Sequence, residues 1–316
     1  MKKTAQLSLF NFFERSYTEF SRRKNGSQRQ RTYFAQSNEA RREHEILLKK
    51  IFRVLKISQF DLEKYVGQST IGNIEKHSIF VPQERNITFR RFWLIVDIKS
   101  AYDTLSFEMF KNFMGNALEN GILREIGEKC FTPDEKLITG ATCSPFLFNF
   151  CMANSLDKKF EEYVSSRKIV FTRYFDDVIF SSHKPFGKRK RRDIFDIVRS
   201  FGFKVNTAKV KALDLGRGPI KLNGYFLSYD KKTDCFNLSL DRQYLCKLRA
   251  KLEAVKQNEG AYSRAQIDGS MSPLIYLVRN FKKRRHLRTS LLERNVLDLY
   301  ANYTISAPSP KNHIFF

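Results

Sequence analysis

Two adjacent aspartates, Asp176 and Asp177, interrupt a run of strand-forming residues in the stretch FTRYFDDVIFSS (171–182). The β-branched and aromatic residues on both sides predict two short strands joined by an acidic turn. The apolar run FWLIV (92–96) also predicts a strand, and it ends abruptly at Asp97. If these strands are neighbours, three carboxylates gather at one edge of a sheet, where only a cation could offset their mutual repulsion.

Helices and strands alternate around this acidic group. Helical spacing of apolar residues predicts helices within 38–58, 106–118, 144–166 and 188–203, and mostly helical structure from about Asp241. A hairpin with Asn25-Gly26 at its turn is predicted within 22–36, and further strands within 221–240. This order predicts an α+β fold, an antiparallel sheet with helices on one face.

The chain is strongly basic. It carries 57 Lys and Arg against 33 Asp and Glu, a formal net charge of +24. This excess predicts a polyanionic partner, with nucleic acid favoured over a merely solvated basic surface. The densest runs are KPFGKRKRRD (184–193) and RNFKKRRHLR (279–288), which would bind phosphates in a salt-dependent way.

Two further observations bear on location. No run of about 18 apolar residues is present, so no membrane-spanning helix and no membrane partner are expected. The 5 cysteines form no CxxC pair, which indicates reduced thiols and a cytoplasmic protein.

Oxygen ligands such as the three carboxylates suit Mg²⁺, which keeps waters and accepts substrate phosphates. Two such ions about 4 Å apart can clamp the attacking and leaving oxygens of a phosphoryl displacement. The alternative is that the Asp-Asp pair is only a turn dipeptide, because Asp favours turns. The pair by itself does not decide between the two interpretations.

Five segments in one order decide it: LIVDIKSAYDTL (94–105), GATCSPFLFN (140–149), YFDDV (174–178), GFKVNTAKV (202–210) and LNGYFL (222–227). This succession resembles the palm motifs of reverse transcriptases, across roughly residues 22–250. It is most similar to the small bacterial enzymes, the retron and other defence-associated reverse transcriptases.

The resemblance implies a right-hand polymerase. Residues 1–90 would form an N-terminal segment and fingers, and residues 91–240 a palm with an antiparallel sheet and inserted fingers helices around 106–140. Residues 241–316 would form a helical thumb and C-terminal tail. NGSQRQRTYFAQ resembles the family's fingers hairpin, and DRQYLCKLRAKL (241–252) resembles the start of its thumb.

The resemblance also assigns the catalytic residues. Asp97 and Asp176 would be the principal ligands of two Mg²⁺ ions, for which Mn²⁺ could substitute, with help from the backbone carbonyl of Ile98. Asp177 would complete the metal site or support the primer terminus.

The implied nucleotide site is larger. Cations on the fingers hairpin would grip the triphosphate, a ring at position 102 would exclude a 2′-hydroxyl, and a lysine would protonate pyrophosphate. Each of these residues also has an interpretation without a function. The hairpin cations would simply be solvated, the ring at position 102 would be an ordinary buried aromatic, and the lysine would be a surface lysine. The nucleotide-binding residues are Lys24, Arg29, Arg31, Tyr102, Thr139, Gly140 and Lys209, and the primer grip is Leu222, Asn223, Gly224 and Tyr225.

Two departures from the family pattern stand out. Members usually carry Pro-Gln-Gly where this chain has Ile138, Thr139 and Gly140. The shorter Thr139 cannot reach as far as glutamine, so nucleotide selection, template use or fidelity would be unusual. The Asn-Ala-x-x-His element of retron enzymes is not evident before Asp97, so another defence-associated group is an equal alternative.

The sequence therefore predicts an RNA-directed DNA polymerase that uses dNTPs, makes a DNA product and works with a companion noncoding RNA in antiphage defence. Alternatives are template-independent or protein-primed DNA synthesis, for which the chain has 13 tyrosines, and a non-catalytic RNA-binding scaffold. An RNA polymerase is disfavoured by Tyr102. Partnership with a second copy or a second defence protein stays open.

Overall fold

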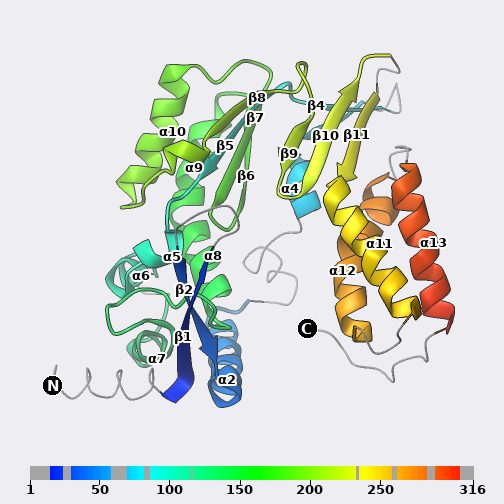
Figure 1. The fold of residues 1–316 in the computed structure, drawn as a ribbon. Coiled ribbons are helices and arrows are strands. Elements are labelled where there is room, and N and C mark those ends of the chain that lie inside the picture. The colour runs from blue at the N-terminus through cyan, green and yellow to red at the C-terminus, as the bar shows by residue number, and fades with distance from the viewer. Residues whose placement is uncertain are drawn as a thin grey trace. The chain divides into compact units, whose positions relative to one another are not determined.

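The computed structural model describes residues 15–23, 30–57, 70–81, 86–114, 117–232, 235–257, 262–282 and 289–306. The chain divides into two compact units (Figure 1). The first contains residues 1–73 and 93–212, and the second contains residues 74–92 and 213–316. The predicted boundaries near residues 90 and 240 are those of functional subdomains and stay predictions.

The first unit is built on a four-stranded sheet with the strand order β6-β7-β5-β8. Strands β6 and β7 pair antiparallel, and the predicted neighbours lie side by side. Five consecutive residues of β7 are buried, so both faces of this strand are covered, and the expectation of a single covered face is wrong for it. The bounds are Phe92–Asp97 for β5, Ile169–Tyr174 for β6, Asp177–Ser182 for β7 and Lys211–Asp214 for β8.

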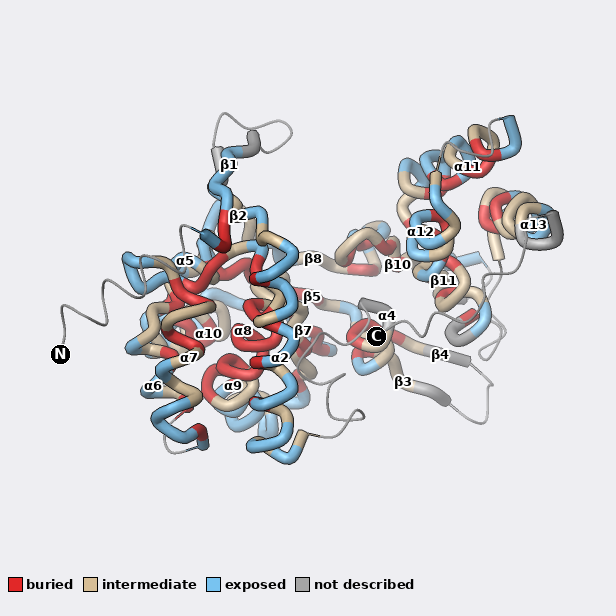
Figure 2. The backbone as a smooth tube through the Cα atoms, turned by 90° about the horizontal axis from the view of Figure 1, so that it is seen from below, coloured by how far each residue is buried: buried red, intermediate tan, exposed pale blue. Residues whose placement is uncertain are grey.

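Seven α-helices lie wholly within the described part of this unit. Figure 2 shows α8 buried along most of its length, whereas α2 has an exposed face. The helices are α2 (Asn38–Val54), α5 (Ala101–Thr104), α6 (Phe107–Met114), α7 (Asn120–Cys130), α8 (Ser144–Asn154), α9 (Leu156–Ser165) and α10 (Lys188–Ser200), with a 3-10 turn η2 (Thr207–Lys209).

Helix ends follow local chemistry where a cap is present. The Ser106 hydroxyl accepts a hydrogen bond from the Met109 backbone N–H at 3.1 Å, which confirms the predicted start of α6. The predicted helix over 144–166 is wrong in one respect, because Ser155 (φ −125°, ψ −90°) divides it into α8 and α9. Periodicity over a long window cannot detect a break of one residue.

An antiparallel hairpin of β1 (Tyr17–Arg23) and β2 (Gln30–Gln36) completes this unit. The strands confirm the predicted hairpin, while its Asn25-Gly26 turn lies outside the described residues. Tyr17 and Phe34 pack in a cluster with Ile138 and Ala141, so the hairpin rests on the loop that precedes α8.

The second unit contains two small sheets and a group of helices. The predicted strands within 221–240 are confirmed in a three-stranded sheet with the order β11-β10-β9, and the helices after Asp241 are confirmed as well. A helix α4 (Thr70–Lys76) crosses into this unit. The remaining bounds are β3 (Ser78–Val81), β4 (Asn86–Phe89), β9 (Ile220–Leu222), β10 (Tyr225–Asp230), β11 (Cys235–Leu240), α11 (Arg242–Gln257), α12 (Arg264–Tyr276), the π-helical η3 (Leu277–Lys282) and α13 (Leu291–Ser306).

Candidate active site

The segments that carry the three acids lie side by side at the end of the first unit's sheet. Asp97 is the last residue of β5 and is buried, while Asp176 and Asp177 lie where β6 turns into β7. The Ile98 backbone N–H donates to the Asp176 carbonyl oxygen at 2.9 Å. The end of β5 is therefore tied directly to the acidic turn.

The Asp97 carboxylate is held on both oxygens by one segment. The Asn206 side-chain amide donates to Oδ1 at 2.8 Å, and the Lys209 ammonium donates to Oδ2 at 2.6 Å. The Asn206 backbone N–H also donates to the Asp97 carbonyl at 2.8 Å. Asp97 is thus already paired with a cationic group.

The Ile98 carbonyl lies on the side of the acidic turn. Ile98 forms an antiparallel bridge with Val205, and the flanking hydrogen bonds to that segment are made by Lys99 and Asp97 rather than by Ile98. Because the N–H and C=O of one extended residue point the same way, and the Ile98 N–H reaches Asp176, the carbonyl faces that residue too. This orientation fits the predicted role.

Tyr102 lies near Asp176. Burial raises the pKa of its hydroxyl, and the nearby Asp176 carboxylate raises that pKa further. The ring stacks on Phe148 of α8, with centroids 4.8 Å apart and planes at 15°. The structure therefore brings the predicted sugar-sensing ring to the acidic turn and backs it with a rigid aromatic surface.

The ligand atoms of the three aspartates do not all lie within 4.8 Å of one another. Within the described ranges, the one group of three or more His, Cys, Asp or Glu side chains with all ligand atoms within 4.8 Å is His44, Cys130 and Cys143. Asp97, Asp176 and Asp177 do not form such a group, so the expected gathering of all three carboxylates is not found at this distance.

The buried cluster of His44, Cys130 and Cys143 is a structural group. His44 Nε2 lies 2.8 Å from the Tyr17 hydroxyl, and Nδ1 accepts from the Cys143 backbone N–H at 3.4 Å. Both ring nitrogens are therefore already engaged. Burial and the neighbouring Cys143 raise the pKa of the Cys130 thiol.

The fingers hairpin is described only in part. Lys24 and Arg29 lie outside the described residues, and of Arg31 only the backbone, which pairs with Arg22, is described. On the same strand, the Phe34 N–H donates to the Thr139 carbonyl at 3.1 Å. The hairpin strand that carries Arg31 thus runs beside Thr139.

Gly140 has no room for a side chain. Its φ is +108°, and an added Cβ would lie 2.6 Å from the Phe34 carbonyl oxygen. The glycine is therefore required for the close approach of β2 to this loop, which is a packing role beside the predicted nucleotide role.

The predicted primer-grip residues form a tight hairpin in the second unit. Leu222 pairs with Tyr225, and Asn223 (φ 43°) and Gly224 (φ 89°) make the two-residue turn between β9 and β10. The Gly224 carbonyl accepts from the Asp241 N–H at 2.9 Å, which ties the turn to the start of α11.

Two residues near the acids were not singled out from the sequence. Asn206 lies within the quoted segment GFKVNTAKV, and Arg173 lies two residues before the acidic turn. For Arg173 the available signal was a charged side chain in an otherwise apolar, strand-like stretch, because buried polar groups need partners.

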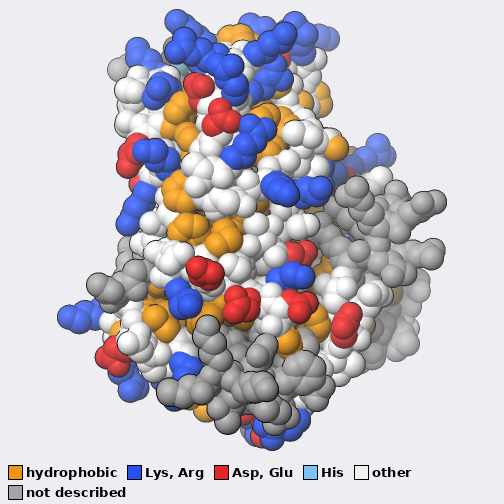
Figure 3. All heavy atoms as spheres, turned by 90° about the vertical axis from the view of Figure 1, so that its left-hand side faces the viewer, with side chains coloured by type: hydrophobic (Ala, Val, Ile, Leu, Met, Phe, Trp, Pro, Cys, Tyr) orange, Lys and Arg blue, Asp and Glu red, His pale blue; other side chains and the backbone are white. Residues whose placement is uncertain are grey.

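The basic run 188–192 opens α10, and four cationic side chains of this helix, Lys188, Arg189, Arg192 and Arg199, are exposed. Figure 3 shows Lys and Arg side chains gathered at the end of the face where α10 lies.

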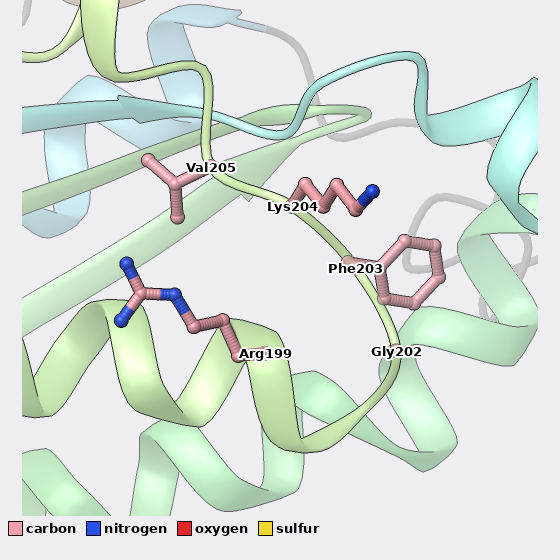
Figure 4. A pocket seen from close by; sticks show the side chains of 5 residues that line it. All are labelled: Arg199, Gly202, Phe203, Lys204 and Val205. Carbon is pink, nitrogen blue, oxygen red and sulfur yellow. The ribbon is translucent and has the colours of Figure 1, made fainter.

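A pocket of roughly 480 Å³ lies between the end of α10 and residues 202–205, where Arg199 and Val205 point toward one another (Figure 4). None of the three aspartates lines this pocket. Most of the second basic run, 279–288, lies outside the described residues.

An antiparallel sheet that carries an aspartate at the end of one strand beside an acidic turn between two others is the palm of a right-hand polymerase. Residues 23–237 match the family described as reverse transcriptase (RNA-dependent DNA polymerase). The chain belongs to the reverse transcriptase family, and the predicted α+β polymerase fold and nucleotidyltransferase class are confirmed by this match.

Two relatives illustrate the similarity. The retron Ec86 reverse transcriptase of Escherichia coli is 26% identical over 238 residues, which is 74% of this chain and 68% of that protein. A telomerase from Candida tropicalis, solved with a fragment of telomeric RNA, has a TM-score of 0.51 at 10% identity, covering 96% of this chain and 61% of that chain. The chain thus spans less than two thirds of the telomerase, and this likeness shows the fold alone.

No described helix has both the length and the apolar character needed to cross a membrane. Cys130, Cys143, Cys151 and Cys246 are free thiols.

Proposed function

We propose that this chain is an RNA-directed DNA polymerase that extends a primer with dNTPs at Asp97 and Asp176, with Asp177 in support. The observation that carries the proposal is the hydrogen bond from the Ile98 N–H to the Asp176 carbonyl, which joins the two acid-bearing segments. Family membership and similarity to a retron reverse transcriptase support RNA as the template.

The donor set suits divalent cations. Carboxylates and a backbone carbonyl are hard oxygen ligands, as Mg²⁺ and Mn²⁺ prefer. The Lys209 ammonium on Asp97 shows that this carboxylate accommodates positive charge. Bound ions would supply Lewis-acid stabilisation of the charge that develops during nucleotidyl transfer.

The remaining residues have roles in binding and orientation. Asn206 orients the Asp97 carboxylate, and the Tyr102 ring, held flat against Phe148, closes the space beside the sugar and favours deoxynucleotides. Lys209 would leave Asp97 when substrate binds and protonate the departing pyrophosphate. Lys24, Arg29, Arg31, Thr139 and Gly140 would complete the nucleotide site, and residues 222–225 would hold the primer end.

The proposal includes a companion noncoding RNA that supplies the template, and a role in antiphage defence in the cytoplasm. The basic side chains of α10 support contact with nucleic-acid phosphates. The sequence of the product and its attachment to protein distinguish untemplated or protein-primed synthesis from RNA-templated synthesis.

The test is incorporation of labelled nucleotides by purified protein with its copurifying RNA and Mg²⁺. Incorporation of dNTPs into DNase-sensitive product, lost in Asp176→Asn/Asp177→Asn, supports the proposal. Product sequence identifies the template, and a protease-sensitive mobility shift indicates protein priming. Absence of incorporation under every condition with cognate RNA refutes the proposal in favour of an RNA-binding scaffold. Incorporation that survives in the double variant refutes the assignment of the chemistry to Asp176 and Asp177.

A further inference from the structure

Arg173 of β6 carries a charge that is almost entirely removed from solvent, with a side chain only 6% exposed. Its Nε and Nη2 each donate to the carboxylate of Asp157 in α9 at 2.8 Å. Nη1 donates to the side-chain oxygen of Asn149 in α8 at 2.7 Å. A buried cation is tolerated only when it is paired and hydrogen-bonded in this way.

The same guanidinium also reaches the acidic turn. Nη1 donates to the backbone carbonyl of Phe175 at 3.0 Å, immediately before Asp176. Phe175 has φ 54°, a left-handed conformation that is unfavourable for a residue with a Cβ. A contact from outside the turn is therefore needed to hold it, and Arg173 provides one from one side while the Ile98 N–H holds Asp176 from the other.

We propose that Arg173 is a positioning residue for the metal-binding acids: it fixes the Phe175–Asp176 backbone so that the Asp176 carboxylate is preorganised beside Asp97. This inference rests on the proposed function in one respect, the binding of a divalent ion by these acids. Groups that orient metal ligands typically change metal affinity by about 10–100-fold when they are removed. A simple structural ion pair would change stability alone.

The decisive measurement is Mn²⁺ affinity of the full chain, followed by electron paramagnetic resonance without nucleic acid or nucleotide. Arg173→Lys keeps the charge but cannot make the forked contact to Asp157 while also reaching Phe175. We expect Mn²⁺ to bind about 10-fold more weakly to this variant. Arg173→Met should show a larger loss, and Arg173→Lys carries the test if that variant does not fold.

Arg167→Lys is the matched control, because Arg167 is exposed and donates to the Tyr163 carbonyl away from the turn. It should bind Mn²⁺ as the unaltered chain does. Asp157→Asn separates the two ends of the network: the Phe175 contact remains available, so its Mn²⁺ affinity should fall less than that of Arg173→Lys. Thermal unfolding of each variant reports stability independently.

The outcomes are distinct. Equal Mn²⁺ affinity in Arg173→Lys and the unaltered chain, with only the unfolding temperature lowered, overturns the inference and leaves polymerase activity untouched. If the unaltered chain binds Mn²⁺ tightly and Arg173→Lys binds it weakly, the inference is supported. This holds even if no dNTP is incorporated, and in that case only the proposed function fails. Absence of Mn²⁺ binding by the unaltered chain overturns the inference.

Discussion

Two hairpin turns in this chain both contain left-handed backbone, and they reach it in opposite ways. The turn between β9 and β10 is Asn223-Gly224, with φ values of 43° and 89°. Both residue types adopt such angles readily, so this turn follows from its own sequence. The turn between β6 and β7 places Phe175 at φ 54°, where a bulky aromatic residue is disfavoured.

The second turn is held by contacts from residues outside the turn itself, one in the preceding strand and one in a neighbouring strand's end. Arg173 binds the Phe175 carbonyl, and Ile98 of the neighbouring strand binds the Asp176 carbonyl. A turn made by local chemistry tolerates change in its surroundings, whereas a turn made by tertiary contacts stores strain at the place where function needs precision. Two variants test the turns themselves, and two others test tertiary contacts elsewhere in the first unit.

The largest effect is expected at the acidic turn. Asp176→Asn should lower the initial rate of dNTP incorporation with Mg²⁺ by at least about 100-fold, because the amide cannot offset the charge of the ion. Asp103→Asn is the control, since Asp103 is an exposed carboxylate in α5 and its loss should leave the rate unchanged. A rate for Asp176→Asn above a tenth of normal would remove this turn from catalysis.

Gly140→Ala should be the most destabilising of the glycine changes. The added methyl would meet the Phe34 carbonyl at 2.6 Å with φ at +108°, which costs about 3 kcal/mol through strain and overpacking. Urea unfolding measures this loss in the free energy of unfolding. Gly121→Ala in α7, with nothing within 4 Å of the new methyl, should be neutral or slightly stabilising. Equal stability of the two variants contradicts the close approach of β2.

Lys209→Met removes the ammonium from Asp97. We expect kcat for dNTP incorporation to fall about tenfold, since a group that orients a metal ligand and assists proton transfer is lost. Lys211→Met, two residues away and exposed, should retain full activity. If both variants behave alike, the Lys209–Asp97 contact has no catalytic consequence.

The smallest effect is expected at the turn made by local chemistry. Gly224→Ala should lower the free energy of unfolding by about 1 kcal/mol, the cost of left-handed backbone for a residue with a Cβ. No atom lies within 4 Å of the new methyl, so no clash adds to this cost. Calorimetry against Gly218→Ala, a glycine without positive φ, isolates the backbone contribution. A loss as large as that of Gly140→Ala would erase the contrast between the turns.

Much of the fold was predictable, because periodicity and caps are local signals. The apolar run before Asp97, the Ser106 cap and the strands on either side of Asp176 all correspond to observed elements. The break at Ser155 was not predictable from periodicity, since its hydroxyl and N–H bond to Cys151 and Met152 of the preceding turn and the apolar spacing continues past it.

The site was predictable in its residue types and less so in its contacts. Asp97 and Asp176 could be named from motifs, and the sheet places their segments side by side. The Lys209 contact with Asp97 spans more than a hundred residues of chain. The close approach that requires Gly140 depends on a hairpin equally distant in sequence.

The sequence by itself determined the turn at Asn223-Gly224, the strand that ends at Asp97 and the family to which the chain belongs. These properties reside in neighbouring residues, whose backbone preferences and ordered motifs are legible without a fold. Only the tertiary structure decided that Asp157 and Asn149 hold Arg173 and that Asn206 and Lys209 share Asp97. Such contacts are long-range, because a buried polar group takes its partners from whichever segments the folded chain brings within hydrogen-bond distance.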